Sequence, residues 1–409
     1  MPDIIVIGGG PAGMMAAGRA ASLGADVWLL EKNPSLGRKL LLTGQGRCNI
    51  TNNLDARQFI TDCGPGAKFL HGALARFSTR EAVDFFERLG LELKLERGGR
   101  YFPESDDSHD VLRALERFLR DEGVKVLKGK KAERAERGNG CFRIFAGRQT
   151  FQAGRLVIAA GGLSFPATGS TGDGYLLAAA LGHTIVPTLP TDVPLGVRED
   201  FVKELQGLSL RNVELRFGQG SSKAVFFGEM LFTHFGVSGP IVLDASRVIG
   251  PWLEHGPVDC VLDLKPALSA EKLDERLKRD IQSRGRKNFR NFLKEFMPST
   301  MIPVFAGQCG IDPVMAVNQT TAGQRRTMIG LLKGIRFTVT GLRGFEEAVA
   351  TAGGVATAEV DPRTMESKIT PGLFFCGEVL DLDGPCGGYN LQIAWSTGFT
   401  AGTGAAAKA

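Results

Sequence analysis

A glycine-rich turn between two short apolar runs near the N-terminus constrains the fold more than any other feature of this sequence. Residues 4–7 read IIVI, and such a continuous apolar run is typical of a strand that is buried on both faces. The turn GGGPAG follows at 8–13, then an alanine-rich helical stretch at 14–23 and a second apolar run at 26–30 that ends at Glu31. The dinucleotide-binding fingerprint has this order of elements: a strand, a G-x-G-x-x-G turn, a helix, a second strand and an acidic residue.

Each part of this fingerprint has a physical role. We expect Gly8 to permit the tight turn, Gly10 to let the backbone approach a pyrophosphate, and Gly13 to let the helix pack closely on the strand. The helix N-terminus offers N–H groups and a partial positive charge to the phosphates. Glu31 can accept hydrogen bonds from ribose hydroxyls and would repel a 2′-phosphate. The predicted nucleotide is therefore FAD or NAD rather than NADP.

Two later segments favour FAD over NAD. Residues 155–160 read as a buried strand that runs into a double glycine, and residues 373–376 read as another strand, followed by a glycine-rich loop and a helix that begins near Asn390. A late strand of this kind carries an acid toward the ribitol and pyrophosphate, and the helix N-terminus stabilises the negative charge of a reduced isoalloxazine. A strand and helix that merely complete the sheet are the alternative. The residues expected at the flavin from these segments are Gly161, Gly377, Glu378, Gly388 and Asn390.

The loop at 37–52 also has features of a flavin site. Its start carries two adjacent cations, Arg38 and Lys39, which suit pyrophosphate oxygens. Its end is rich in glycine and polar residues, among them Gly46 and Asn49, and suits a flat ring held by backbone hydrogen bonds. We therefore favour a binding role for this loop over a solvated basic loop.

The electron donor is constrained by what the sequence lacks. We find no second strand–G-x-G-x-x-G–helix unit, because the glycines at 341–344 and 353–354 lack the spacing and the later acid. NAD(P)H would therefore bind only transiently, or the substrate itself would be the donor. The seven cysteines form no C-x-x-C pair, which argues against disulfide-reductase chemistry and a structural zinc site and favours reduced thiols in a cytosolic protein. No metal site is expected.

The middle of the chain reads as an insertion that begins at a proline-punctuated boundary, residues 188–194. Helical periodicity occupies 269–297, and we expect strands at 335–339 and 353–355 to return to the first domain. Short strand-like runs, which suit a small antiparallel sheet or barrel, lie at 193–197, 212–217, 223–227 and 258–264.

The predicted fold class is α/β. A Rossmann-like FAD-binding domain, formed by residues 1–190 and 334–409, carries an inserted substrate domain at 191–333. We expect that insertion to have a β-barrel-like part at 191–265 and a small helical part at 266–333.

Within the insertion, residues 228–236 are the segment most suited to face a substrate. Phe232, His234 and Phe235 can form the floor of a pocket over the flavin, with Thr233 or His234 as a hydrogen-bonding or proton-transfer group. Thr233 and His234 are thus the candidate catalytic residues. The alternative is that His234 caps a turn and the phenylalanines belong to the core.

Charge gives a weak indication of partners. Lys and Arg number 49 against 44 Asp and Glu, a formal net charge of +5, which is too small to argue for nucleic acid by itself. The basic run at 284–290 can contact RNA or an acidic partner, but a solvated helix end explains it, so we do not expect nucleic acid. No run reaches about 18 apolar residues and no signal peptide is recognisable. We expect a soluble, cytoplasmic protein, and the sequence leaves its oligomeric state open.

Four long motifs resemble those of the YhiN/BaiN-like flavoproteins, which are often labelled aminoacetone-oxidase-like. They are residues 37–52, 161–174 (GGLSFPATGSTGDG), 228–240 (GEMLFTHFGVSGP) and 377–398 (GEVLDLDGPCGGYNLQIAWSTG). The resemblance covers essentially the whole chain and implies an FAD domain assembled from both chain ends around the insertion. Family members have been linked to amine oxidation and to reduction of steroid-type enones, so the resemblance gives no substrate. The FAD contacts that it implies are Ala12, Glu31, Arg38, Lys39, Asn49, the strand near Ala132, Glu378, Asn390 and Leu391.

We therefore expect an FAD-dependent oxidoreductase that transfers a hydride between flavin and a small organic substrate, with NAD(P)H as a transient donor. Two alternatives belong to other classes. One is a flavin-dependent RNA-modifying protein, and the other is an FAD-holding redox sensor without turnover.

Overall fold

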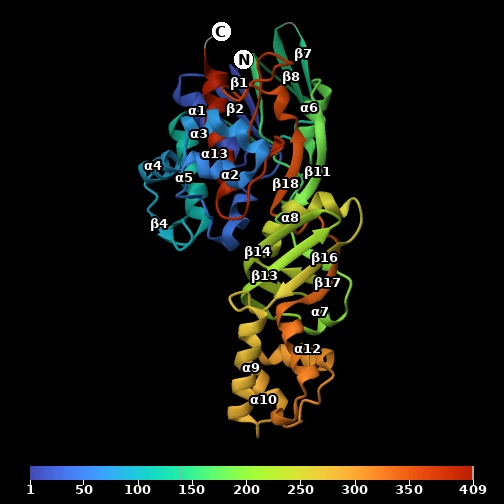
Figure 1. Cartoon of the computed structure of the whole chain (residues 1–409). Helices are drawn as coiled ribbons and strands as arrows, with labels where there is room; N and C mark the ends of the chain where they lie inside the picture. The colour runs from blue at the N-terminus through green and yellow to red at the C-terminus, as the bar shows by residue number, and fades with distance from the viewer. Residues whose placement is uncertain (139, 408–409) are drawn as a thin grey trace. The chain divides into compact units, whose positions relative to one another are not determined.

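The computed structural model describes residues 1–138 and 140–407. Contacts divide the chain into two compact units, shown in Figure 1. The first unit joins Met1–Pro190 to Phe345–Ala409, so both ends of the chain contribute to it, and the second is Thr191–Gly344. Among the described residues, no helix combines the length and the apolar character that crossing a membrane requires.

A parallel five-stranded sheet forms the centre of the first unit, with the strand order β19-β10-β1-β2-β6. Every residue of the central strand β1 is buried, as expected for a strand that is covered on both faces. This arrangement confirms the predicted Rossmann-like fold. The strands are β1 (Ile4–Ile7), β2 (Val27–Glu31), β6 (Lys125–Lys128), β10 (Arg155–Ile158) and β19 (Leu373–Phe375).

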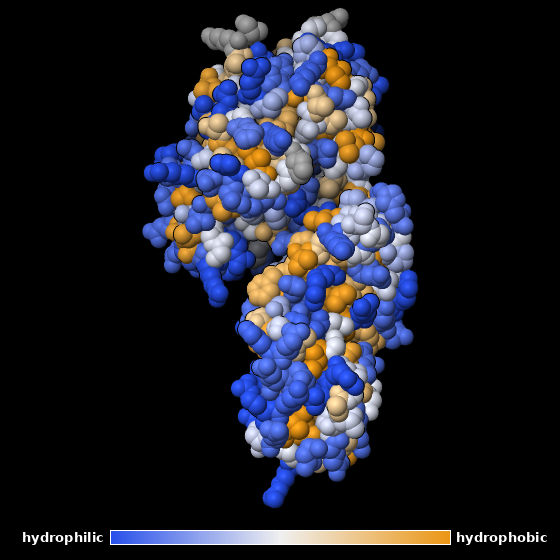
Figure 2. Space-filling model, viewed as in Figure 1, coloured by the Kyte–Doolittle hydropathy of each residue, from blue (hydrophilic) through white to orange (hydrophobic). Residues whose placement is uncertain are grey.

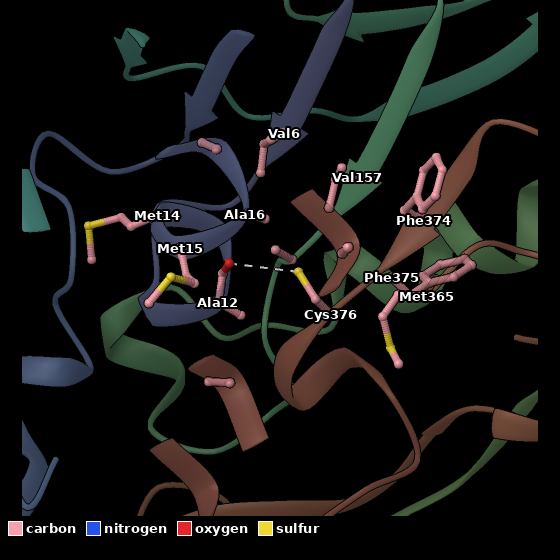
Figure 3. Packing of buried hydrophobic residues seen from close by; sticks show 14 of the residues in the cluster. Val6, Ala12, Met14, Met15, Ala16, Val157, Met365, Phe374, Phe375 and Cys376 are labelled. Atoms are coloured by element: carbon pink, nitrogen blue, oxygen red, sulfur yellow. Dashed lines mark hydrogen bonds between the residues drawn. The ribbon is translucent and has the colours of Figure 1, made fainter. Parts of the chain in front are cut away.

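Two helices from opposite ends of the chain pack together beside this sheet, α1 (Pro11–Ser22) and α13 (Tyr389–Ala406). Glycine permits their close approach, because a Cβ at Gly398 would lie 2.5 Å from the carbonyl oxygen of Ala12. Figure 3 shows Ala12 of α1 beside Cys376, whose Sγ lies 3.8 Å from the same oxygen. The C-terminal helix is therefore part of the core of the nucleotide-binding fold.

Smaller elements surround the sheet of the first unit. Two three-stranded antiparallel sheets have the orders β3-β5-β4 and β7-β8-β9, and β11 pairs with β18. The strands are β3 (Thr51–Asn52), β4 (Leu93–Glu96), β5 (Arg100–Pro103), β7 (Arg134–Gly138), β8 (Cys141–Ala146), β9 (Gln149–Ala153), β11 (Ile185–Thr191) and β18 (Ala350–Val355), and the helices are α2 (Ala56–Cys63), α3 (His71–Arg76), α4 (Thr79–Arg88), α5 (Ser108–Asp121) and α6 (Asp173–Ala180).

A closed barrel with the order β12-β15-β14-β13-β16-β17 forms part of the second unit, which confirms the expected barrel. The structure differs from our expectation for residues 335–339, because Ile335–Leu342 does not return to the first unit but closes the barrel between β16 and β12. Its inward side chains Phe337 and Val339 lie opposite Cys260 and Val258. The strands are β12 (Leu195–Val197), β13 (Ser209–Gln219), β14 (Ser222–Phe232), β15 (Gly236–Ser238), β16 (Val258–Asp263) and β17 (Ile335–Leu342).

The second unit also contains the predicted helical part. Leu273 and Leu277, one turn apart on α9, are buried with Phe289 and Phe292 of α10, so the helices share an apolar core. Thr321 and Gln324 form a capping box at the start of α12. The helices of this unit are α7 (Phe201–Glu204), α8 (Pro240–Leu253), α9 (Ala270–Arg284), α10 (Phe289–Leu293), α11 (Ile302–Cys309) and α12 (Ala322–Lys333).

Candidate functional site

A cavity in the first unit opens at the carboxyl ends of β1, β2 and β10. Its empty volume is about 1270 Å³, part of which is open to solvent. This is the edge at which open parallel sheets bind their ligands. The lining residues come from segments 7–12, 30–43, 130–132, 159–173, 349–350 and 377–394.

The turn between β1 and α1 has glycines that serve the fold and a glycine that leaves space for a ligand. A Cβ at Gly8 would lie 2.4 Å from the carbonyl oxygen of Ala159, and one at Gly13 would lie 1.9 Å from that of Gly8. A Cβ at Gly10 would meet nothing within 4 Å, and Gly10 lines the cavity. Gly10 is also the N-cap of α1, and no side chain there accepts a hydrogen bond from the first N–H groups of the helix. The turn therefore fits a dinucleotide, with room for phosphate oxygens at the helix N-terminus.

The carboxylate of Glu31 is held at the end of β2. Its Oε2 accepts a hydrogen bond from the backbone N–H of Gly9 at 2.7 Å, and its Oε1 accepts from the backbone N–H of Asn33 at 2.7 Å. The residue is only 7% exposed and lines the cavity. Each carboxylate oxygen can accept more than one hydrogen bond, so Glu31 retains acceptor capacity for a ribose.

A second carboxylate, that of Glu378, lies in a network that includes a lysine. Lys39 Nζ lies 2.7 Å from Oε2 and 2.9 Å from Oε1 of Glu378. The Ser164 hydroxyl donates to Oε1 at 2.6 Å, and the backbone N–H of Thr351 donates to the same oxygen at 2.9 Å. Sequence reasoning identified Lys39 and Glu378 but missed Ser164 and Thr351. Neither missed residue stands out by its type, although Ser164 lies in the 161–174 motif.

Further cations line the cavity near Glu31, namely Lys32, Lys130 and Lys131, and sequence reasoning missed all three. Lys32 forms an ion pair with Asp173, and Lys131 lies 3.3 Å from the same carboxylate. Burial raises the pKa of Asp173, but the ammonium groups of Lys32 and Lys131 outweigh this effect and the net pKa is lowered. Asp173 is thus a charged member of the wall.

The structure brings most of the predicted cofactor residues to this cavity. Four predicted residues, Gly13, Gly46, Asn49 and Gly388, lie outside its lining. The predicted residues that line it are Gly8, Gly10, Ala12, Glu31, Arg38, Lys39, Ala132, Gly161, Gly377, Glu378, Asn390 and Leu391.

Asn49 and Gly388 are in contact at the start of α13. In the orientation that satisfies both polar atoms of its amide, the Asn49 side chain donates to the carbonyl of Thr51 at 3.0 Å and accepts from the N–H of Gly388 at 2.9 Å. Gly388 has a φ of 88° and is the N-cap of α13. The side chain of Asn390 accepts from the N–H of Gly384 at 2.9 Å and donates to its carbonyl at 2.8 Å. These bonds fix the start of α13 at the cavity, near the predicted position.

The candidate catalytic residues lie in the second unit, in the turn between β14 and β15. The Thr233 hydroxyl accepts from the N–H of Gly236 at 3.1 Å. His234 is exposed, and its ring centroid lies 4.9 Å from that of Phe235. The expectation that Phe232 forms the floor of a pocket is wrong, because its side chain is 1% exposed and belongs to the barrel core. Catalytic roles for Thr233 and His234 stay predictions.

Cys48, Cys141, Cys260, Cys309 and Cys376 are free thiols. Cys48 and Cys376 are completely buried. Burial raises the pKa of Cys48 to about 12 and raises that of Cys376 as well. Both groups are therefore neutral thiols at pH 7, which is unsuited to nucleophilic sulfur chemistry.

Comparisons with known proteins agree with this geometry. A family model described as "HI0933-like protein Rossmann domain" matches residues 2–404. The chain is 36% identical over 413 residues to the 3-dehydro-bile acid delta(4,6)-reductase of Clostridium scindens, which covers 100% of both proteins. It is 30% identical to proteins named ribosomal RNA dihydrouridine synthase from Haemophilus influenzae and Escherichia coli, over 97% of this chain and 96% of each relative.

Two solved structures share the fold at low sequence identity. An open flavocytochrome c3 fumarate reductase has a TM-score of 0.51 at 18% identity, over 99% of this chain and 78% of that chain. The 3-ketosteroid delta1-dehydrogenase of Sterolibacterium denitrificans has a TM-score of 0.50 at 14% identity, over 99% of both chains. These likenesses concern the fold alone.

Proposed function

Because this chain belongs to the HI0933-like Rossmann family and is an FAD-dependent oxidoreductase, we propose that it reduces a carbon–carbon double bond conjugated to a carbonyl group. The family membership confirms the resemblance of the four sequence motifs to the YhiN/BaiN-like proteins, and FAD is confirmed as the cofactor.

The observation that supports this reaction is common to two relatives with different names. A 3-dehydro-bile acid delta(4,6)-reductase, by its name, acts on double bonds conjugated to a ketone at C3. A dihydrouridine synthase, by its name, saturates the double bond of a uracil ring, which is conjugated to a ring carbonyl. When a double bond directly conjugated to the carbonyl is reduced, as in a 4-en-3-one or a uracil ring, the carbon remote from the carbonyl gains a hydride and the carbon next to the carbonyl gains a proton. The two substrates differ greatly in size, so the reaction class is the property we transfer.

The residues of the cavity suit the binding of FAD. Bound and reduced FAD supplies the hydride. We propose that the N–H groups at the start of α1 and the cations Arg38 and Lys39 hold the diphosphate, since the turn leaves open space at Gly10. Glu31 accepts from the ribose. Glu378, fixed by Ser164 and Thr351, positions Lys39 and limits its motion.

We also propose that NAD(P)H reduces the protein during a transient encounter, since the sequence contains only one G-x-G-x-x-G unit of the required context. A cytoplasmic location is favoured by the absence of any C-x-x-C pair in the sequence and by the free thiols of Cys48, Cys141, Cys260, Cys309 and Cys376, since thiols persist in a reducing compartment.

An anaerobic titration tests the reaction. Protein that has been reduced with dithionite is mixed with a 4-en-3-one steroid or with a uridine-containing RNA, and flavin absorbance is followed while the product is analysed by mass spectrometry. We expect one of the two substrates to reoxidise one flavin per molecule and to gain two hydrogen atoms. FAD-free protein is the control. Reoxidation by oxygen alone, together with reduction of the oxidised protein by amines, would instead indicate an amine oxidase.

A further inference from the structure

The positive charge of this protein is confined to the helical part, residues 266–333. This segment contains twelve Lys and Arg against six Asp and Glu, a net charge of +6. The rest of the chain has 37 Lys and Arg against 38 Asp and Glu. The small net charge of the whole protein therefore hides a strong local asymmetry, and such an asymmetry is a property of surfaces that bind polyanions.

Half of these cations form ion pairs with nearby carboxylates. Glu295 pairs with two of them, Arg284 and Lys287, so it neutralises part of the basic run at 284–290. The ion pairs of these six cations are Arg276–Asp280 at 3.5 Å, Lys278–Asp274 and Arg325–Asp274 at 2.6 Å, Lys287–Glu295 at 3.2 Å, Lys333–Asp263 at 2.6 Å and Arg284–Glu295.

The other six cations are exposed and form no ion pair with the residues that the structure describes. Four of the six are arginines. They are Lys272, Arg279, Arg286, Arg290, Lys294 and Arg326.

These six residues lie on neighbouring elements. Lys272 and Arg279 are seven residues apart on α9, so they share one face of the helix about 10 Å apart. Arg286 lies two residues beyond the end of this helix. The Arg325–Asp274 pair at 2.6 Å joins α12 to α9. Hydrophilic side chains predominate over the helical part in Figure 2. The six cations therefore belong to one small body with a shared apolar core.

We propose that the helical part is a docking surface for the phosphate backbone of RNA. Arginine binds phosphate in a bidentate fashion and is the residue best suited to nucleic-acid backbones. This inference rests on the reaction proposed above, with a uracil base in RNA as the group that is reduced.

The surface lacks the features that other polyanion sites require. Within 266–333, the one exposed large hydrophobic side chain among the described residues is Val314. A stacking platform for bases needs exposed aromatic rings, and a membrane-binding face needs an apolar face beside its cations. The surface thus contacts phosphates, which positions an RNA without reading its sequence. Selection of the target base has to occur elsewhere.

A pair of variants with equal change in net charge tests the proposal. The first carries R279E, R290E and R326E in the helical part. The matched control carries K68E, R80E and R148E, which are exposed cations of the first unit. Binding of a fluorescein-labelled RNA hairpin with a uridine-containing loop is measured by anisotropy over a series of salt concentrations, with FAD-loaded protein.

We expect the first variant to lose at least about 10-fold in affinity and its log–log salt slope to become shallower by about 2, since each lost phosphate contact contributes about 0.7–0.9. The control variant should bind like the unmodified protein. Absence of binding at low salt, equal losses in both variants, or preferential binding to phosphatidylserine vesicles that RNA does not displace would overturn the proposal.

Two further measurements separate this proposal from the reaction. FAD content and melting temperature of both variants show whether they fold. Reoxidation of the reduced variants by a 4-en-3-one steroid shows whether the redox site works. If the unmodified protein binds RNA but reduces neither substrate, the proposed reaction is contradicted and the docking surface is not. If the first variant loses RNA binding but still reduces the steroid, the result supports the docking surface alone.

Discussion

Lys39 and Glu378, which are 339 positions apart in the sequence, form an ion pair in the wall of the cavity, with Nζ 2.7 Å from Oε2. Each side chain is about one-fifth exposed. The Ser164 hydroxyl and the backbone N–H of Thr351 donate to the same carboxylate. The pair therefore joins the loop after β2 to the segment after β19, and it does so at the place where we expect the diphosphate of FAD.

Replacement of Lys39 by Met and of Glu378 by Gln tests this pair. Each single variant should weaken FAD binding by about 10-fold or more, because hydrogen bonds to charged groups contribute about 1.5–3 kcal/mol. The double variant should lose less than the sum of the single variants, since the two groups are in direct contact. FAD dissociation constants from fluorescence titration measure both effects. Lys68→Met, at an exposed position, is the control, and strict additivity would contradict a coupled pair.

The glycines of the first turn allow a comparison in which each variant adds one methyl group. Gly13→Ala should destabilise the protein by about 1–3 kcal/mol, because its Cβ would lie 1.9 Å from the carbonyl oxygen of Gly8. Gly10→Ala should leave the melting temperature of FAD-free protein unchanged, because its Cβ enters open space. Its FAD affinity should nevertheless fall about 10-fold, since the methyl group occupies the path of the diphosphate. Unchanged FAD binding by Gly10→Ala would contradict this placement.

Local sequence rules account for the nucleotide-binding half of the site. The strand β1, the turn after it and Glu31 were predictable because each depends on neighbours within about thirty residues. The start of α13 was predictable from the glycines before it. In contrast, Ser164 and Thr351 meet only because β10 and β18 bring together segments 187 positions apart, and neither residue type is unusual.

The wrong expectation for residues 335–339 also has its origin in long-range contacts. The alternation of Ile335, Phe337 and Val339 predicts a strand, but it is compatible with any sheet that has one covered face. Its pairing with β16 and β12 depends on long-range contacts. The wrong expectation for Phe232 has a similar cause. The sequence around an aromatic residue in a glycine-rich segment does not show whether its side chain lines a pocket or belongs to a core.

Alkylation of the buried thiols tests whether sulfur takes part in catalysis, and we expect that it does not. Cys48, Cys260, Cys309 and Cys376 are buried, and burial raises the pKa of each one. These four should resist iodoacetamide at pH 8 in native protein and react only after denaturation. Mass spectrometry of tryptic peptides identifies the alkylated positions. Rapid native alkylation of Cys48 with loss of activity would instead indicate a reactive thiol beside the loop at 37–52.

His183 lies in the interior of the first unit, apart from the residues that line the cavity. Its Nε2 lies 2.8 Å from the Ser367 hydroxyl, and its Nδ1 lies 3.1 Å from Oε2 of Glu359. The ring also packs edge-on against Phe375. Burial lowers the pKa of His183, and the opposing effect of Glu359 does not cancel that shift.

This depression predicts that the protein loses stability in mild acid. A histidine whose folded pKa lies below its unfolded value of about 6.5 contributes stability above that pH and loses it as the pH falls, because the unfolded chain binds the proton more readily. The melting temperature should therefore decline between about pH 7.5 and pH 5.5, and the decline should be smaller in His183→Gln, which does not titrate. His255→Gln, at an exposed position, should keep the decline of the unmodified protein. An equal decline in His183→Gln would assign the effect to other groups.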